Sequence, residues 1–143
     1  MNSELSWEPR LLAFVCNWAY YTPSERAELE RAALEGDRIV RVPCSGRVSP
    51  YLLLGAVQEG YDAVLVVGCE ASVCHYREGS RLAQERLSAL HQFLVYLGLE
   101  PGRIHLFWRS PIAGRPFADL LAEARAAARA LGPACRLVRS GEP

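Results

Sequence analysis

Four cysteine thiols stand at, or just after, the ends of three apolar segments of the sequence. These thiols belong to Cys16, Cys44, Cys69 and Cys74. Thiolates are soft ligands that suit iron–sulfur clusters, zinc or copper. Because three separate segments lead into a cysteine in the same way, we expect one shared site rather than four unrelated core positions.

Other interpretations of the same thiols are open. Cysteine is also a small apolar residue that is often buried, and for any single cysteine here that explanation is the better one. Zinc is the main chemical rival, since four thiolates satisfy its tetrahedral geometry. A thiol-redox enzyme using Cys69 and Cys74 is a weaker alternative, because their spacing lacks the Cys-x-x-Cys geometry that such enzymes favour.

Strands and helices alternate along the chain that carries these thiols. Apolar, β-forming runs predict strands at 11–16, 38–42, 63–67 and 104–108. Capping signals, glycine stops and apolar residues at helical spacing predict helices at 23–35, 50–59, 80–97 and 117–131. The first of these helices opens with Thr22-Pro23-Ser24-Glu25, which combines an N-cap, a proline at the first position and a capping-box glutamate.

This alternation predicts the α/β class: a single-domain, four-stranded parallel sheet with helices on both faces, of the Rossmann/flavodoxin-like kind. We expect one domain over 1–143, with 1–10 and 134–143 as terminal extensions. Ligands of such sheets bind outside the carboxyl ends of the strands. Cys16, Cys44 and Cys69 are expected at those ends, so the fold and the thiols predict the same location for a site.

Charge and composition narrow the range of functions. The 143 residues carry 16 basic and 16 acidic side chains, so the formal net charge is zero, which argues against nucleic acid or anionic lipid as the main partner. No signal peptide or membrane-spanning run of roughly 20 residues is present. We therefore expect a cytoplasmic protein with reduced thiols, and five cysteines, an odd number, also disfavour a pure disulfide framework.

Several short motifs lie around and beyond the thiols. They are Cys16-Asn17-Trp18, Val42-Pro43-Cys44-Ser45-Gly46-Arg47-Val48, Gly68-Cys69 with Cys74-His75-Tyr76, Trp108-Arg109-Ser110 and Leu131-Gly132-Pro133. Together they resemble a known family, the delta (iron–sulfur) subunit of methyl-viologen-reducing hydrogenase. The similarity covers about 11–133, and its most specific parts are Cys-Ser-Gly-Arg-Val and Gly-Cys-x4-Cys-His-Tyr.

The resemblance implies an electron-transfer subunit of an oxidoreductase complex that has no catalytic residue of its own. It implies a 2Fe–2S cluster held by Cys16, Cys44, Cys69 and Cys74. The partners that it implies are a hydrogenase or other donor and a flavin-containing, heterodisulfide-reductase-type subunit. The alternative is a zinc-stabilised or cluster-free adaptor subunit of such a complex.

One departure from the family pattern bears on that choice. The family's first motif is usually Cys-x-x-Cys, whereas Ala19 stands here at the position of the second cysteine. The four retained thiols just meet the requirement of a 2Fe–2S cluster. Cys135 lies beyond the matched motifs, and we interpret it as an incidental thiol.

The residues around the motifs give further expectations. His75 either binds metal, or hydrogen-bonds near a cluster, or, as we favour, is a loop histidine. Arg47 and Arg77 are expected to favour thiolate over thiol or to be surface groups. The loops 17–21, 45–48 and 70–79 are expected to form a docking surface, to which Tyr20, Tyr21 and Tyr76 contribute, and Trp18 and Trp108 are expected either to shield the site or to pack in the core.

Overall fold

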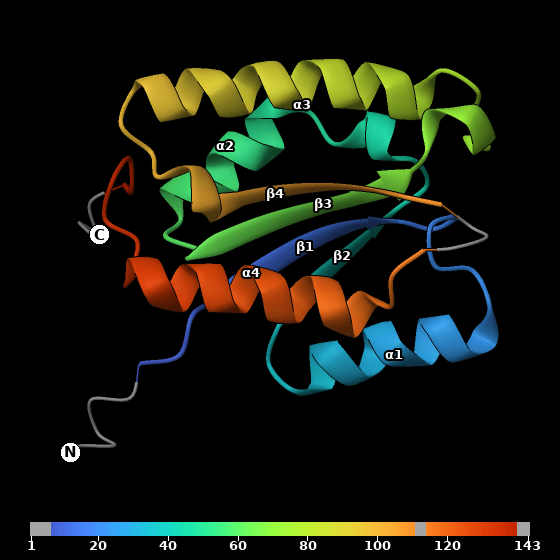
Figure 1. Ribbon diagram of the computed structural model, residues 1–143, viewed down its shortest axis with the longest axis horizontal. Coiled ribbons are helices and arrows are strands. Elements are labelled where there is room, and N and C mark those ends of the chain that lie inside the picture. Colours follow the sequence, from blue (N-terminus) through green and yellow to red (C-terminus); the bar gives the residue numbers. More distant parts are fainter. Residues whose placement is uncertain (1–6, 111–113, 140–143) are drawn as a thin grey trace.

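Four parallel strands form the centre of the computed structural model, which describes residues 7–110 and 114–139 (Figure 1). The strands are β1 (Leu11–Cys16), β2 (Arg38–Val42), β3 (Ala63–Cys69) and β4 (Ile104–Arg109). They lie in the order β2-β1-β3-β4, and every neighbouring pair is parallel. The predicted α/β class and parallel sheet are thereby confirmed.

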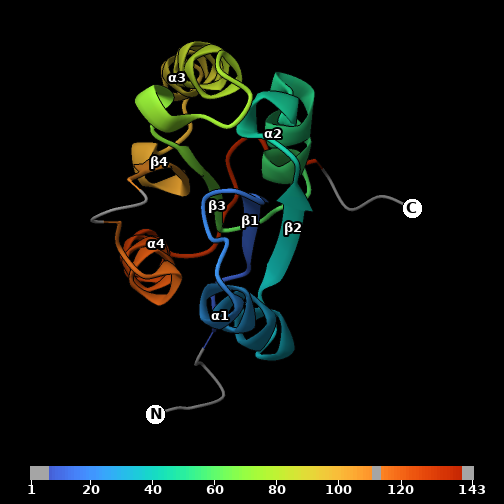
Figure 2. The ribbon, with the colours of Figure 1, turned by 90° about the vertical axis from the view of Figure 1, so that its right-hand side faces the viewer.

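Four helices cover the two faces of this sheet. They are α1 (Pro23–Leu34), α2 (Pro50–Gln58), α3 (Gly79–Tyr96) and α4 (Phe117–Leu131). Helices α2 and α3 lie on one face, and α1 and α4 lie on the other (Figures 1 and 2). Among the described residues, no helix combines the length and the apolar character that crossing a bilayer requires.

The helix ends follow the local sequence signals. At α1 the Thr22 hydroxyl accepts from the Glu25 amide at 3.3 Å, and the Glu25 carboxylate accepts from the Thr22 amide at 3.0 Å. This is the capping box that the sequence predicts. Gly36 follows the end of α1 with φ +110°, a backbone conformation that glycine adopts without strain.

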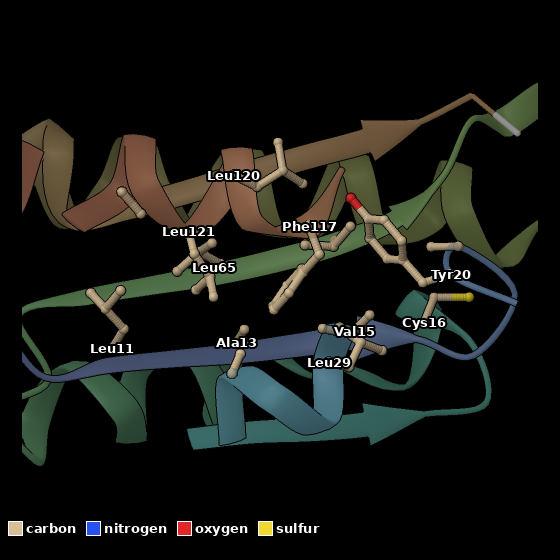
Figure 3. Close-up of a cluster of buried hydrophobic side chains, with 14 of the residues drawn as sticks. Leu11, Ala13, Val15, Cys16, Tyr20, Leu29, Leu65, Phe117, Leu120 and Leu121 are labelled. Atoms are coloured by element: carbon tan, nitrogen blue, oxygen red, sulfur yellow. The ribbon is translucent and has the colours of Figure 1, made fainter. Parts of the chain in front are cut away.

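Two apolar cores fill the space between the sheet and its helices. Strand β3 is buried along its whole length. Alternate residues of β1 and β3 point to opposite faces, so Ala13 and Leu65 pack against α1 and α4, whereas Phe14 and Val66 pack against α2 and α3. Figure 3 shows the first of these cores.

Three one-turn 3₁₀ segments interrupt the connections between these elements. They are η2 (Ser45–Arg47), η3 (Ala71–Val73) and η4 (Pro101–Arg103). Segments η2 and η3 follow β2 and β3, so they lie at the carboxyl edge of the sheet, the edge that faces the viewer in Figure 2. The sequence predicts both stretches only as loops.

Polar residues hold the two ends of the domain to the amino edge of the sheet. The buried Asp62 carboxylate accepts from the Arg10 amide at 2.7 Å and from the Ala134 amide at 2.8 Å. The buried Arg103 guanidinium donates to Glu100 at 3.0 Å and to the Asp62 carbonyl at 3.1 Å. Residues 7–10 and 134–139 are therefore fixed to the sheet; 1–6 and 140–143 lie outside the described residues.

Candidate metal centre

The structure brings Cys16 and Cys69 into direct contact. Cys16 ends β1 and Cys69 ends β3, the two central strands of the sheet. Their sulfur atoms lie 3.8 Å apart, and both side chains are buried. Because parallel strands end at one edge, two residues that are 53 positions apart in sequence meet there.

Cys44 and Cys74 form a second pair beside the first. Cys44 is the N-cap residue of η2, and Cys74 follows η3. The sulfur atoms of both residues lie against Gly79. A Cβ atom at Gly79 would overlap the Cys44 sulfur and stand 3.8 Å from the Cys74 sulfur, so this glycine leaves the space that the thiols occupy.

Backbone amides point at three of the four sulfurs. The Trp18 amide donates to Cys16 at 3.4 Å, the Gly46 amide donates to Cys44 at 3.4 Å, and the Ser80 amide donates to Cys74 at 3.3 Å. The last donor belongs to the first turn of the 18-residue helix α3, where the helix dipole also favours negative charge. Hydrogen bonds to sulfur are among the features that tune an iron–sulfur centre.

The pKa values of the two central thiols, Cys16 and Cys69, are shifted in opposite directions. A hydrogen bond from Cys69 lowers the pKa of Cys16 to about 6, against the opposing effect of burial. The same hydrogen bond, followed by burial, raises the pKa of Cys69. Burial is also the main reason that the pKa of Cys44 is raised.

Arg47 and Arg77 are exposed, which fits the expectation that they are surface groups. The principal causes of the thiol pKa shifts are burial, the neighbouring thiols and the backbone amides.

The donor set fits a soft metal group, although the thiols are arranged in pairs. Within 7–110 and 114–139, no three Cys, His, Asp or Glu side chains stand in an arrangement that would hold a metal ion. The Cys16 and Cys69 sulfurs contact each other at 3.8 Å, and the Cys44 and Cys74 sulfurs both border Gly79. The chemistry of four thiols, the amide donors and the space at Gly79 nevertheless match what an iron–sulfur cluster or zinc requires.

Four aromatic rings, including that of His75, pack together on the loops beside this site. The Trp18 ring stacks on His75 with centroids 3.7 Å apart and on Tyr21 with centroids 5.0 Å apart. Tyr76 meets the His75 ring edge-on at 4.7 Å. His75 is exposed and serves as a packing partner of Trp18, which agrees with the loop histidine favoured by the sequence. The stack joins the loop after β1 to the loop before α3.

Tyr20 does not belong to the exposed surface that the sequence predicts. Its side chain is 1% exposed, its hydroxyl donates to the Arg115 carbonyl at 2.8 Å, and its ring packs edge-on against Phe117. The expectation that Tyr20 contributes to docking is therefore wrong, because its ring is needed in the core between the sheet and α4. Trp108 is half-buried and packs against the core under α3.

The position of the missing cysteine also lies at the site. Ala19 is buried, and its backbone amide donates to the Cys16 carbonyl at 3.0 Å. A side chain at position 19 is thus close to the thiols. Cys135, in contrast, is exposed and lies next to Ala134 at the amino edge, away from the site.

Two contributors were missed in the sequence, Gly79 and Ser80. Gly79 makes room for the Cys44 and Cys74 sulfurs, and Ser80 donates its amide to Cys74 and its hydroxyl to the Cys69 carbonyl. The sequence signal for this role was a glycine at the very start of a helix that follows a thiol-bearing loop. The sequence analysis predicts the helix only from residue 80 and leaves Gly79 in the loop.

Comparisons with known proteins agree with the motifs. Residues 11–132 match the family described as methyl-viologen-reducing hydrogenase, delta subunit. The iron-sulfur subunit of the F420-non-reducing hydrogenase of Archaeoglobus profundus is 41% identical over 128 residues, which cover 89% of this chain and 93% of that protein. The vhc iron-sulfur subunit of the F420-non-reducing hydrogenase of Methanococcus voltae is 36% identical over 129 residues, which cover 90% of each chain.

A similar segment also occurs inside a much longer protein. This protein is one of the subunits of the ferredoxin:CoB-CoM heterodisulfide reductase of Methanosarcina mazei. It is 32% identical over 126 residues, which cover 87% of this chain but only 16% of that protein. The family match spans β1 to the end of α4, so it includes all four thiols and the whole sheet. This chain belongs to the delta-subunit family of methyl-viologen-reducing hydrogenase.

Proposed function

We propose that this chain is an electron-transfer subunit that holds a 2Fe–2S cluster on Cys16, Cys44, Cys69 and Cys74. It connects a hydrogenase or other electron donor to a flavin-containing, heterodisulfide-reductase-type partner. One observation carries the proposal: the four thiols at, or just after, three strand ends lie at the carboxyl edge of the sheet, where two of the sulfurs contact each other and two border Gly79. When bound, the cluster supplies a one-electron redox couple, and four thiolates are its usual ligands.

The surrounding residues supply what such a site needs from the protein. Burial of Cys16, Cys44 and Cys69 limits the access of water. The amides of Trp18, Gly46 and Ser80 provide fixed donors toward sulfur, and they offset the negative charge of thiolates without any rearrangement.

The partner class is supported by the relatives. Two of them are named as iron-sulfur subunits of hydrogenases, and another contains the same segment within a subunit of heterodisulfide reductase. Segments fused in one protein often correspond to separate chains that work side by side. We therefore infer that this chain docks on a heterodisulfide-reductase-type subunit.

A second candidate is an adaptor that contains zinc or no metal. Two observations favour it: Ala19 stands where the family usually has cysteine, and the described thiols lie in pairs rather than around a common centre. Such an adaptor would keep the fold and the docking loops while lacking a redox centre.

Anaerobic purification decides between the two candidates. Iron, acid-labile sulfide and zinc are assayed per chain, and the visible spectrum is recorded before and after reduction. About two irons and two sulfides per chain, with bands that bleach on reduction, support the electron-transfer subunit. One zinc, or no metal at all in protein isolated without oxygen, supports the adaptor and contradicts the proposal.

The variant Ala19→Cys tests whether four thiols are sufficient. If the four retained thiols hold the cluster, iron per chain is the same in the wild-type protein and in the variant. An iron-poor wild-type protein whose iron rises in Ala19→Cys would show instead that position 19 supplies a required ligand. Ala13→Cys, in the buried middle of β1, is the control for simply adding a buried thiol.

A further inference from the structure

The carboxyl edge of the sheet carries more positive charge than the neutral chain as a whole. Four exposed arginines lie on the elements and loops of this edge, namely Arg26, Arg41, Arg47 and Arg77. In the part of the chain that the structure describes, none of them has a carboxylate within 4.0 Å. Two acidic groups nearby are engaged elsewhere, since Glu25 pairs with Arg109 at 2.8 Å and Glu78 pairs with Arg81. Glu70, which follows β3, is also exposed at this edge, and the four arginines outnumber it.

Two hollows open on this edge beside the thiols. One, of about 510 Å³, is lined by the rings of Trp18 and Tyr21 and by Arg26 and Arg41. The other, of about 430 Å³, is formed largely by apolar groups and reaches Cys44. Pro43 and Tyr76 line both, so the two hollows are adjacent.

The lining of the first hollow suits a carboxylate-bearing surface. The Arg26 guanidinium lies over the Tyr21 ring, 5.2 Å from its centroid, which holds the charge at the rim without neutralising it. Arg41 enters the same hollow from β2. Aromatic residues and arginine are the residue types enriched where proteins bind each other.

The second hollow would bring a docked partner close to one of the thiols. Cys44 is the thiol that lines a surface hollow, and its neighbours there include Gly46 and Gly79, which have no side chains. A partner that places an apolar side chain in this hollow comes close to the sulfur and excludes water from the contact. Electron exchange between proteins requires such an approach.

We propose that this edge binds an acidic surface of the heterodisulfide-reductase-type partner, with carboxylates at Arg26 and Arg41 and an apolar side chain in the hollow beside Cys44. This inference rests on the proposed function, and it adds the charge and the chemistry of the partner's surface. Opposite charges of this kind speed the encounter of two proteins and fix their orientation.

A charge-reversal pair with a matched control tests the inference. The test variant is Arg26→Glu/Arg41→Glu. The control is Arg31→Glu/Arg38→Glu, which makes the same charge change in exposed residues of the same helix and the same strand, but nearer the amino edge. Binding of each anaerobically purified chain to the purified heterodisulfide-reductase-type partner is measured by calorimetry at two salt concentrations, and iron per chain is assayed in parallel.

We expect the test variant to bind about tenfold more weakly and to lose most of the salt dependence, while the control changes by less than about twofold. Tyr76→Ala, at the wall between the hollows, is expected to weaken binding several-fold without a change in salt dependence. Iron per chain is expected to be equal in all four proteins.

Three outcomes would overturn the inference. Equal loss of binding in the test and control variants would show that overall charge, and not this edge, matters. Absence of binding by the wild-type chain, or tighter binding to a nucleic acid than to the protein, would remove the acidic partner as the occupant. Iron per chain reports separately on the proposed function, so an iron-loaded protein that fails to bind contradicts only the docking inference.

Discussion

The amino and carboxyl edges of the sheet differ in whether their polar groups have partners within the chain. At the amino edge, Asp62 and Arg103 are 3% and 2% exposed, and each is hydrogen-bonded to several groups of this same chain. At the carboxyl edge, four thiols gather, and the exposed Arg26, Arg41, Arg47 and Arg77 have no carboxylate partner among the described residues. One edge is complete within the chain, whereas the other offers groups to something outside it.

This difference indicates that the amino edge stabilises the fold and that the carboxyl edge carries the functional groups. Buried polar groups that are fully paired specify and hold a fold, but they leave nothing to bind a ligand. Soft or charged groups left without partners cost some stability and are characteristic of functional sites. We therefore expect substitutions at the amino edge to change unfolding and substitutions at the carboxyl edge to change metal content or binding.

The largest effect is expected from Cys74→Ser. Under the four-thiol proposal, iron falls from about two per chain to nearly none or becomes labile, because a hydroxyl is a weaker ligand than thiolate for this iron. Cys74 is only partly buried, so the metal-free protein is expected to unfold at the same denaturant concentration as the wild type. Iron assay and chemical denaturation measure the two quantities.

Cys135→Ser is the matched control, because it removes an exposed thiol near the opposite edge. Its iron content is expected to equal that of the wild type. A stable, full complement of iron in Cys74→Ser would contradict the assignment of the four thiols.

At the other edge, Arg103→Met is expected to lower the free energy of unfolding by about 3 kcal/mol. The substitution keeps the buried volume but removes the side-chain donors to the Glu100 carboxylate, to the Asp62 carbonyl and to the Pro133 carbonyl. Urea denaturation of the metal-free chain measures this. Iron per folded chain is expected to remain unchanged, and a loss of iron would show that the two edges are not independent.

Arg81→Met provides the comparison for a surface ion pair. Its side chain is 51% exposed and pairs with Glu78 and Glu85 along α3. We expect only a negligible change in the free energy of unfolding, since exposed pairs contribute little.

Gly79→Ala is expected to lower iron per chain severalfold with a small effect on folding. The new methyl group would overlap the Cys44 sulfur, so the thiol has to move away from its position. Gly55→Ala, in α2, has nothing within 4 Å of the added methyl group and is expected to stabilise the chain by about 0.5–1 kcal/mol. Normal iron content in Gly79→Ala would mean that this glycine does not shape the site.

Among the four main substitutions, a small effect is expected from Tyr20→Phe, which alters a residue of the carboxyl edge that is buried and hydrogen-bonded, as Asp62 and Arg103 are at the amino edge. Loss of the hydrogen bond to Arg115 is expected to cost about 1 kcal/mol at pH 7. Burial raises the pKa of Tyr20 to about 12, so the neutral form is favoured in the folded state. The contribution of Tyr20 is therefore full below about pH 10, the ordinary pKa of tyrosine, and is lost as the pH rises toward 12.

Denaturation of both proteins at several pH values measures this difference. The gap in unfolding free energy between wild type and Tyr20→Phe is expected to be constant from about pH 7 to 9 and to shrink above about pH 10. A gap that grows at high pH would contradict the assigned direction of the pKa shift.

The fold could be predicted from the sequence because its signals are local. The capping box at Thr22, the buried run of β3 and the glycine after each of the first helices each act within a few residues. The strand ends could likewise be predicted, and parallel pairing then brings Cys16 and Cys69 together. These features depend on neighbours in sequence and on one rule of topology.

The details of the site could not be predicted in the same way, because they depend on contacts between distant segments. The stacking of Trp18 on His75 joins residues from different loops, and the space at Gly79 matters only once Cys44 lies beside it. Tyr20 and Tyr21 are neighbours of the same type, yet one is buried and the other is 53% exposed. Composition alone could not separate them.

The two hydrogen bonds to the Asp62 carboxylate also determine where this domain can be linked to another polypeptide or to a surface. Arg10 and Ala134 are bonded to the same carboxylate, so the chain enters and leaves the sheet at neighbouring points, on the side away from the thiols. A linker attached beyond either point, whether to a larger polypeptide or to an electrode, would hold the domain by the amino edge of its sheet. Immobilised in that orientation, the thiol-bearing edge would face the solution, which makes the domain suited to surface voltammetry.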